Sequence, residues 1–404
     1  MRQLTGPLAR REFRLYFLGN VSSNVGTWLA NVALGVYMLD LTGSSLWVGL
    51  TNAALFVPVL LFAIPAGAWA DRTDRLRLLA GAQILAGSLA GVLAILVALN
   101  AANRYAVVAI AFGLGITIAI GLPAMQSVIP SLVPQDELAE AIGLNALTFN
   151  LARAVGPVLA AVTIAGAGVG LAFAVNAFSY IALIAVLVMI GRPPYLRERD
   201  GEPGRIRDGL VYAWRHKRTR TMLLAVMAMA MSLDPILTLS PALADVYGLP
   251  EGGAGWIVSA WGGGAVLAIT LGRTWIRYAT KHGLGWAGLI AQAAGLGALG
   301  VAPNIAAAIP ASVLTGAGYI TAAIAFTTAI QEDVPERLRG RVMALWSVSF
   351  LGPRVLAAVI DGALADAFNP HVAVVVLTIP ALVAAFFVRR MTPPRTDEPV
   401  APAA

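Results

Sequence analysis

The sequence has no cysteine, only three histidines and few charged residues. Without cysteine the chain can form no disulfide, no thiolate metal site and no cysteine nucleophile, and three separate histidines offer little for a metal ion. Charged residues occupy 12% of the 404 positions, whereas hydrophobic residues occupy 58%. A soluble protein of this size would need far more polar surface. The composition therefore excludes a soluble globular protein and predicts an integral membrane protein.

Motifs for nucleotide, metal and nucleic-acid chemistry are also missing. The sequence has no Gly-Lys-Ser/Thr phosphate loop and no metal-ligand spacing, so we expect no enzyme, no cofactor and no direct use of ATP. The net charge of +7 could suggest a nucleic-acid partner, but the basic residues lie between apolar runs. We therefore interpret them as topology signals and expect no nucleic acid as a partner.

Apolar runs of membrane-spanning length recur along the whole chain, since about 20 helical residues cross a bilayer. The first six predicted spans lie near 14–38, 45–70, 77–98, 104–131, 140–166 and 170–191. The second six lie near 220–244, 253–276, 284–302, 305–331, 341–364 and 370–390. We predict an all-α integral membrane fold, with twelve transmembrane helices in two pseudo-symmetric six-helix halves. The halves are 1–191 and 220–390, with a cytoplasmic linker 192–219 and a cytoplasmic tail 391–404.

The placement of Lys and Arg predicts the orientation. Nearly all of the loop Lys and Arg residues fall in the even-numbered loops, and the opposite loops carry only Arg104. By the positive-inside rule both termini lie in the cytoplasm, and we expect a multi-pass protein of the cell inner (plasma) membrane with an uncleaved first span. In the linker, Leu210, Val211 and Trp214 have the spacing of one helix face. This segment is either an amphipathic helix on the membrane surface or a plain tether.

The sequence contains an internal repeat, in which similar motifs recur about 200 residues apart. Val133-Pro134 precedes a span with Gly156-Pro157, and Val334-Pro335 precedes a span with Gly352-Pro353. Two six-span halves in the same orientation form the parallel repeat of a transporter that rocks around a central site.

The segment between spans two and three carries a dense charge pattern. A glycine there allows close helix approach, and the acids and arginines can pair with charges across the two halves and so stabilise one conformation. We interpret this segment as a gating loop, with Gly67, Asp71, Arg72, Asp74 and Arg75 as its functional residues.

This loop resembles the signature loop of the major facilitator superfamily, and the whole chain resembles the enterobactin-exporter-like, multidrug efflux branch of that superfamily. Further matching residues are Ser23-Asn24, Gly26-Thr27-Trp28, Leu41-Thr42-Gly43-Ser44, Pro123, Gln126, Pro130, Leu132-Val133-Pro134, Leu144-Asn145, Asn150, Arg153, Gly156-Pro157, Gln331, Pro335 and Arg339-Gly340-Arg341-Val342. The resemblance implies a monomer with a central cavity lined by spans one, four, seven and ten. It places Gln126 in that cavity and adds Arg341 to the gating residues.

The chain also departs from that branch. Relatives often carry an arginine and an acid in span one, where this chain has Asn31 and Gly35. The second-half counterpart of the signature loop, 272–277, has no acid. Substrate and proton coupling are therefore not transferred from the resemblance.

Span one carries a polar stripe at helical spacing, made by Asn20, Asn24, Thr27 and Asn31. Such a stripe avoids lipid, so it faces a water-filled cavity or bonds to another helix. We favour the cavity, because the resemblance places span one there.

Arg153 and Arg354 lie close to the middle of their spans, at matching places in the two halves. An arginine there costs about 2.5 kcal/mol or more without a partner or water. Either arginine could bind an anionic group of a substrate or pair with an acid, or it could bond to asparagines and backbone carbonyls. Both interpretations stay open for Arg153, and we favour a functional role for Arg354.

Asp234 is our candidate for proton coupling, because it is an acid inside a predicted span and Pro235 follows it. Proline removes a backbone donor and tends to kink a helix, which suits a gate or a proton site. The alternative is that Asp234 lies in water near the outer mouth. Asp361 lies seven residues after Arg354 on the same helix face and could pass protons outward. We expect it instead to be a water-exposed acid at the span end.

These patterns predict a secondary active transporter that exports a small organic compound by alternating access, with proton antiport. The compound is siderophore-like, drug-like or another secondary metabolite, and the partners are this substrate, protons and the lipid bilayer. One alternative is an importer of the same fold. A second is a membrane partner protein that does not transport.

Overall fold

The computed structural model describes residues 6–191, 194–195, 206–275 and 281–391, without the side chains of 63–72, 75, 127, 206–207, 272–275, 281–282 and 337. The first half contains η1 (Gly6–Ala9), α1 (Arg11–Thr42), α2 (Ser45–Arg72), α3 (Arg75–Ala98), α4 (Arg104–Leu132) and α5 (Leu138–Ile190). The second contains α6 (Ile206–Arg215), α7 (Lys217–Met231), α8 (Asp234–Thr238), α9 (Ser240–Val246), α10 (Ala254–Trp275), α11 (Lys281–Gly300), α12 (Ile305–Asp333), α13 (Glu336–Ala367), α14 (Pro370–Val376) and α15 (Ile379–Arg389).

The helices confirm the predicted fold class. Eleven stretches of the described residues are long and apolar enough to cross a membrane. One of them, α5, is 53 residues long and contains two spans joined at Gly168, whose φ of 78° and ψ of 172° interrupt the helix. Glycine adopts this conformation without steric cost. Counting α5 twice gives the twelve predicted spans.

Polar residues begin several spans, as their capping chemistry requires. The Asn103 side chain accepts hydrogen bonds from two backbone N–H groups of α4, and Asn304 and Asn369 cap α12 and α14 in the same way. Capping supplies partners to N–H groups that have none inside the helix. The caps therefore set where the spans start after their short loops.

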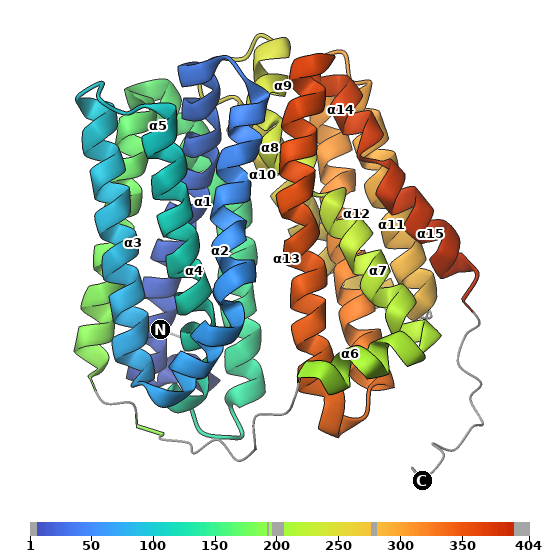
Figure 1. Ribbon diagram of the computed structural model, residues 1–404. Coiled ribbons are helices and arrows are strands. Elements are labelled where there is room, and N and C mark those ends of the chain that lie inside the picture. The colour runs from blue at the N-terminus through green and yellow to red at the C-terminus, as the bar shows by residue number, and fades with distance from the viewer. Residues whose placement is uncertain (1–5, 192–193, 196–205, 276–280, 392–404) are drawn as a thin grey trace.

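The spans form two bundles that lie side by side (Figure 1), with α1–α5 coloured blue to green and α7–α15 coloured yellow-green to red. The first residue of α1 and the last residue of α15 are directed toward the lower end in this view, which we call the termini end. The amphipathic segment of the linker forms α6, which lies under the second bundle at that end.

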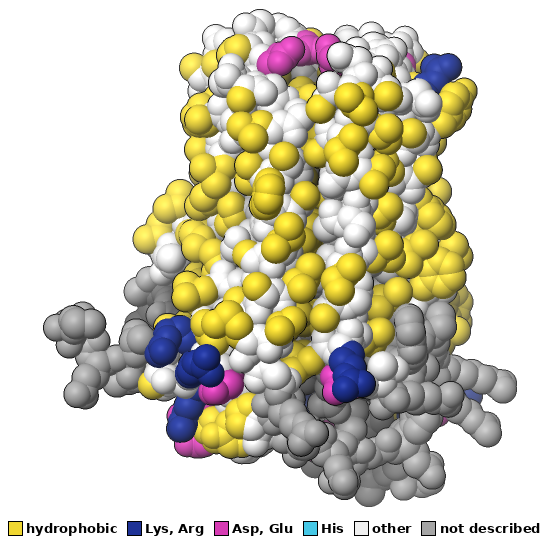
Figure 2. Space-filling view, turned by 90° about the vertical axis from the view of Figure 1, so that its left-hand side faces the viewer, with side chains coloured by type: hydrophobic (Ala, Val, Ile, Leu, Met, Phe, Trp, Pro, Cys, Tyr) yellow, Lys and Arg dark blue, Asp and Glu magenta, His cyan; other side chains and the backbone are white. Residues whose placement is uncertain are grey.

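The middle of the molecule is apolar on its outside. Figure 2 shows hydrophobic side chains over the middle of one face, with the described Lys, Arg, Asp and Glu side chains gathered near its two ends. A band of this kind matches the hydrocarbon core of a bilayer. The surface therefore agrees with a protein that spans a membrane.

The two halves pack tightly at the end opposite the termini, which we call the closed end. A Cβ atom added to Gly49 of α2 would lie 2.1 Å from the carbonyl oxygen of Ala358 in α13. One added to Gly255 of α10 would lie 2.2 Å from the carbonyl oxygen of Pro157 in α5. Only glycine permits such close backbone contact.

The ion pairs of the described residues at the termini end each stay within one half. Their N–O distances are 2.8, 2.7 and 2.8 Å, for Arg10–Glu137, Arg218–Asp333 and Arg341–Asp208 respectively. The described hydrogen bonds between the halves all lie in the other part of the bundle, at Ser44–Leu46 with Asp366 and at Asn52 with Thr238. Among the described residues, hydrogen bonds thus join the halves in this other part of the bundle.

Candidate functional site

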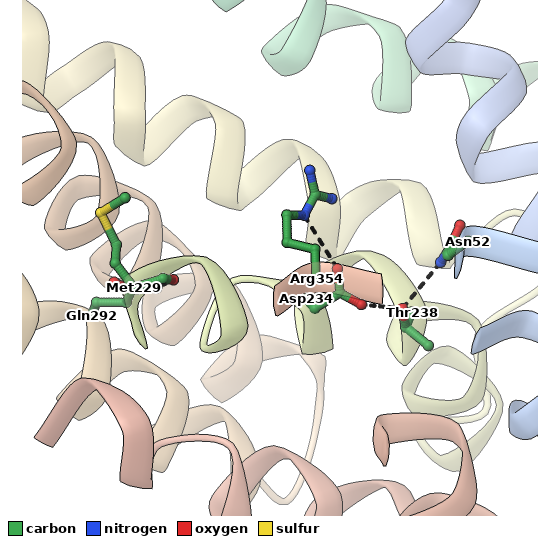
Figure 3. Close-up of polar contacts among 6 residues, drawn as sticks. All are labelled: Asn52, Met229, Asp234, Thr238, Gln292 and Arg354. Carbon is green, nitrogen blue, oxygen red and sulfur yellow. Dashed lines mark hydrogen bonds and ion pairs between the residues drawn. The ribbon is translucent and has the colours of Figure 1, made fainter. Parts of the chain in front are cut away.

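A buried ion pair lies where the first span of the second half is broken. α7 ends at Met231 and α8 begins at Asp234, followed by Pro235 in the first turn, where its missing N–H costs nothing. The Arg354 Nε of α13 lies 3.3 Å from Asp234 Oδ1 (Figure 3), and the two residues are 6% and 0% exposed. The structure thus places Asp234 inside the protein, which excludes the alternative of an acid at the outer mouth.

The break is supported by a neighbouring helix. The Gln292 side chain of α11 donates a 2.9 Å hydrogen bond to the carbonyl oxygen of Met229, in the last turn of α7 (Figure 3). This bond satisfies a carbonyl group close to the point where the helix ends. The second half thereby holds the Asp234 backbone in place.

A chain of hydrogen bonds connects Asp234 to the other half. Asn52 Nδ2 of α2 donates to Thr238 Oγ1 at 3.0 Å, and Thr238 Oγ1 donates to Asp234 Oδ2 at 2.9 Å (Figure 3). Because the Asn52 amide nitrogen only donates, the Thr238 hydroxyl oxygen accepts that bond. The guanidinium of Arg354 favours the ionised form of the Asp234 carboxyl group.

Arg354 also faces the first half. Its guanidinium carbon lies 4.0 Å from the ring centre of Phe56 in α2, a cation–π contact between the halves. Arg354 lines a pocket between the two halves, together with Trp28, Asn31, Asn52, Phe56 and Ser240. The ion pair is therefore part of the wall of the pocket in which the halves meet.

Arg153 lies among aromatic rings. Its guanidinium carbon is 4.9–5.6 Å from the ring centres of Phe149 and Trp28 in the first half and Trp261 and Tyr319 in the second. Its Nε and Nη1 atoms have no hydrogen-bond partner among the described residues, although Arg153 is 7% exposed. The expected bonds to asparagines and carbonyls are therefore not seen at these two atoms, and four rings from both halves surround the charge.

The polar stripe of α1 divides into two parts. Asn20 Nδ2 donates to Asn145 Oδ1 of α5 at 2.8 Å, and Asn24 Nδ2 donates to Asn20 Oδ1 at 3.1 Å. Thr27 and Asn31 instead line a second pocket inside the first half, and Asn31 also lines the pocket between the halves. Bonding to another helix thus describes Asn20 and Asn24, and facing a cavity describes Thr27 and Asn31.

The predicted gating residues are only partly described. The side chains of Gly67, Asp71, Arg72 and Arg75 lie outside the described residues. Asp74 caps α3 by accepting a 3.0 Å hydrogen bond from the Arg77 backbone N–H.

Two further predicted residues lie apart from the pocket between the halves. Arg341 pairs with Asp208 of α6 at 2.8 Å, inside its own half. Gln126 is exposed on α4 and lines neither of the two pockets. The structure therefore does not bring Gln126 or Arg341 to the ion pair.

The expectation for Asp361 is wrong. Its residue is 0% exposed, and neither carboxyl oxygen has a hydrogen-bond partner among the described residues. The prediction failed because it treated the last turns of α13 as open to water, whereas α2 packs closely there. A Cβ added to Gly362 would lie 2.4 Å from the carbonyl oxygen of Ser45.

Sequence reasoning also missed Asp366, which joins the halves at the closed end. Its carboxylate accepts hydrogen bonds from Ser44 Oγ and from the backbone N–H groups of Ser45 and Leu46, at 2.7 and 3.2 Å for the backbone. Ser44 is the N-cap residue of α2, but its own side chain makes no capping bond. An acid of the second half therefore caps a helix of the first.

Comparison with known proteins agrees with this architecture. Two curated relatives, the enterobactin exporters EntS of Shigella boydii serotype 18 and of Escherichia coli O139:H28, are each 24% identical over 89% of this chain and 86% of their own. The structure of a bacterial homologue of the human lysosomal transporter Spinster, inward-facing and occupied, matches with a TM-score of 0.77 at 16% identity, covering 93% of this chain and 95% of that one. The nucleoside transporter NupG matches with a TM-score of 0.77 at 11% identity, covering 94% and 98%.

The structural neighbours share the fold, and the family model gives the narrower assignment. The model described as transmembrane secretion effector matches residues 3–404. The chain therefore belongs to the transmembrane secretion effector family, among the transporters of the major facilitator superfamily.

Proposed function

We propose that this transporter exports a small organic compound across the bacterial inner membrane, in exchange for protons. The termini end faces the cytoplasm, the closed end faces outward, and the halves rock about the pocket between them. Asp234 is the site of proton coupling. The observation that carries the proposal is the buried Asp234–Arg354 pair, because its hydrogen bonds and ring contact reach the other half.

Exchange of substrate for protons follows from the contacts that the ionised Asp234 makes within the second half and, through Thr238, with the first half. In this conformation its carboxylate binds Arg354 and, through Thr238, is joined to Asn52 of the first half. These bonds oppose movement of the halves while the carrier is empty. A bound substrate that replaces them, or a proton that neutralises Asp234, removes the restraint. The empty, unprotonated carrier then cannot change sides, which is what exchange requires.

The lining of the pocket supports the substrate class. Aromatic rings of Trp28 and Phe56 and amides of Asn31 and Asn52 offer stacking and hydrogen bonds to a planar, polar compound. Arg153 contacts the Trp28 ring, so a positive charge lies behind this part of the pocket wall. The outward direction is supported by the family description and by the names of the relatives.

The test compares small molecules in cells and in medium, without preselection, for four strains. They are the source strain, its deletion, and the deletion complemented with the wild type or with Asp234→Asn. We expect one compound to accumulate inside the deletion strain and to leave only when the wild type is restored. Asp136→Asn, which changes an exposed acid between α4 and α5, is the matched control and should restore export.

Two other results would change the proposal. A compound that stays unconsumed in the medium of the deletion strain would identify an importer. Full, gradient-driven export by Asp234→Asn would leave the direction intact and remove Asp234 from the coupling step.

A further inference from the structure

Asp361 is a buried acid that the proposed coupling step does not use. It lies on α13 seven residues after Arg354 and five before Asp366, and so between the ion pair and the closed end. Its residue is 0% exposed, and no donor among the described residues reaches either of its oxygens. α8, which begins with Asp234, packs against α13. The buried cluster thus contains two carboxyl groups and one arginine.

The helices around Asp361 supply no other cation for it. The described side chains of α2, at positions 45–62, carry no charge, and α8 contributes Asp234. The charged side chains of α6, α7 and α12 lie at the termini end, and α14 contributes His371, whose ring packs against Tyr247 with centroids 5.8 Å apart. On α13 itself, Arg354 is engaged by Asp234, and Asp366 by the first turn of α2. Asp361 therefore has no partner that would compensate a negative charge.

The ion pair assigns the charge within the cluster. Asp234 lies 3.3 Å from the guanidinium Nε of Arg354, so it is the ionised member and neutralises Arg354. A charged Asp361 would add an uncompensated anion to this buried site, beside the charge of Asp234. A neutral, protonated Asp361 leaves the cluster without net charge.

We propose that Asp361 is a second proton-binding site, which holds a proton in this conformation while Asp234 is ionised. The inference rests on the proposed function, because it gives the exchanged proton its entry point. When the closed end opens, water from the outside reaches Asp361. The O–H bond of Asp361 breaks and one forms at Asp234, which releases Arg354. The Asp361 carboxylate then takes a proton from the outer water, and the proton on Asp234 leaves at the termini end after the halves change sides.

The test is infrared difference spectroscopy of the purified full chain, titrated from acidic to alkaline pH. A buried protonated carboxyl group gives a C=O band that shifts in heavy water and is absent from carboxylates. We compare wild type, Asp361→Asn, Asp361→Glu, Asp234→Asn and the exposed control Asp136→Asn. Asparagine matches a neutral aspartic acid in size, and each variant is first checked for an unchanged melting temperature and elution volume.

We expect the band at neutral pH in the wild type, its loss in Asp361→Asn, and its retention in the control. Asp234→Asn removes the negative charge that neutralises Arg354, so this variant should keep the band at acidic pH and lose it at a lower pH than the wild type. The glutamate variant should retain a band at a shifted frequency, which assigns the band even if the asparagine variant folds poorly. A band that survives in Asp361→Asn and disappears in Asp234→Asn would overturn this inference and leave Asp234 as the proton site. If no variant, including the wild type, shows a titrating band, the inference and the proposed coupling both fail.

Discussion

Removing the carboxylate of Asp366 should open the closed end. This side chain accepts three hydrogen bonds from the start of α2, at Ser44, Ser45 and Leu46, and is the only described side chain that caps this helix. Loss of an N-cap costs about 1 kcal/mol, and a negative charge at a helix N-terminus adds about 0.3–1 kcal/mol. Because the contact exists only when the halves meet, Asp366→Ala should shift the equilibrium toward the form that is open at this end by about 1–2 kcal/mol. That shift is about 5–30-fold in the ratio of the two forms.

The absence of cysteine makes this shift directly measurable, since any introduced cysteine is the sole labelling site in its half. Leu99 and Val301 lie at the closed end, one in each half, and are 70% and 74% exposed. Spin labels at Leu99→Cys and Val301→Cys report the separation of the halves by pulsed electron–electron resonance. The population at longer distance should grow in Asp366→Ala and grow less in Asp366→Asn, whose amide oxygen still accepts from N–H groups.

Glu251→Ala is the matched control, because it removes an exposed acid from the same end. It should leave the distance distribution unchanged. If Asp366→Ala also leaves it unchanged, or if the control shifts it equally, capping of α2 by the second half does not stabilise closure and the reasoning is refuted.

Three further predictions concern the two ends of the molecule. Partial burial and the nearby charge of Asp40 raise the pKa of Asp245 in the closed form. The closed form therefore holds its proton on Asp245 more tightly. Closure should weaken as pH rises from the ordinary pKa of an aspartate toward the raised pKa of Asp245. The same spin labels should show this pH dependence, and Asp245→Asn should remove it. Gly255→Ala places a methyl group against the backbone of α5 and should increase the population that is open at this end, whereas closure as tight as in the wild type would contradict the packing. Arg10→Ala removes the exposed ion pair with Glu137 and should leave the melting temperature unchanged, since such pairs contribute little; a clear fall would show that the pair stabilises the first half.

The spans were predictable from sequence because hydropathy over about 20 residues depends on local composition alone. The break at Asp234 was also indicated locally, by Pro235. The partner of Asp234 was not, because Arg354 lies 120 residues away and the sequence does not report which helices pack together. The aromatic surroundings of Arg153 were missed for the same reason.

The burial of Asp361 shows a different limit of sequence reasoning. Its seven-residue spacing from Arg354 placed it on the correct helix face, but burial depends on how closely a neighbouring helix approaches. Here Gly362 lets α2 approach α13 at backbone distance. A glycine beside an acid in a span is the local signal for such a close approach of a neighbouring helix.

The glycine contacts at the closed end have a consequence for electrical insulation. At Gly49 and Gly362 the backbones of α2 and α13 approach so closely that an added Cβ would lie 2.1 and 2.4 Å from a carbonyl oxygen of the other helix. Such a contact leaves no width for a file of water molecules, along which protons would otherwise cross the protein without doing work. Larger residues at these positions would hold the helices apart and admit water. The small size of these two glycines thus helps to keep water and protons from passing between α2 and α13.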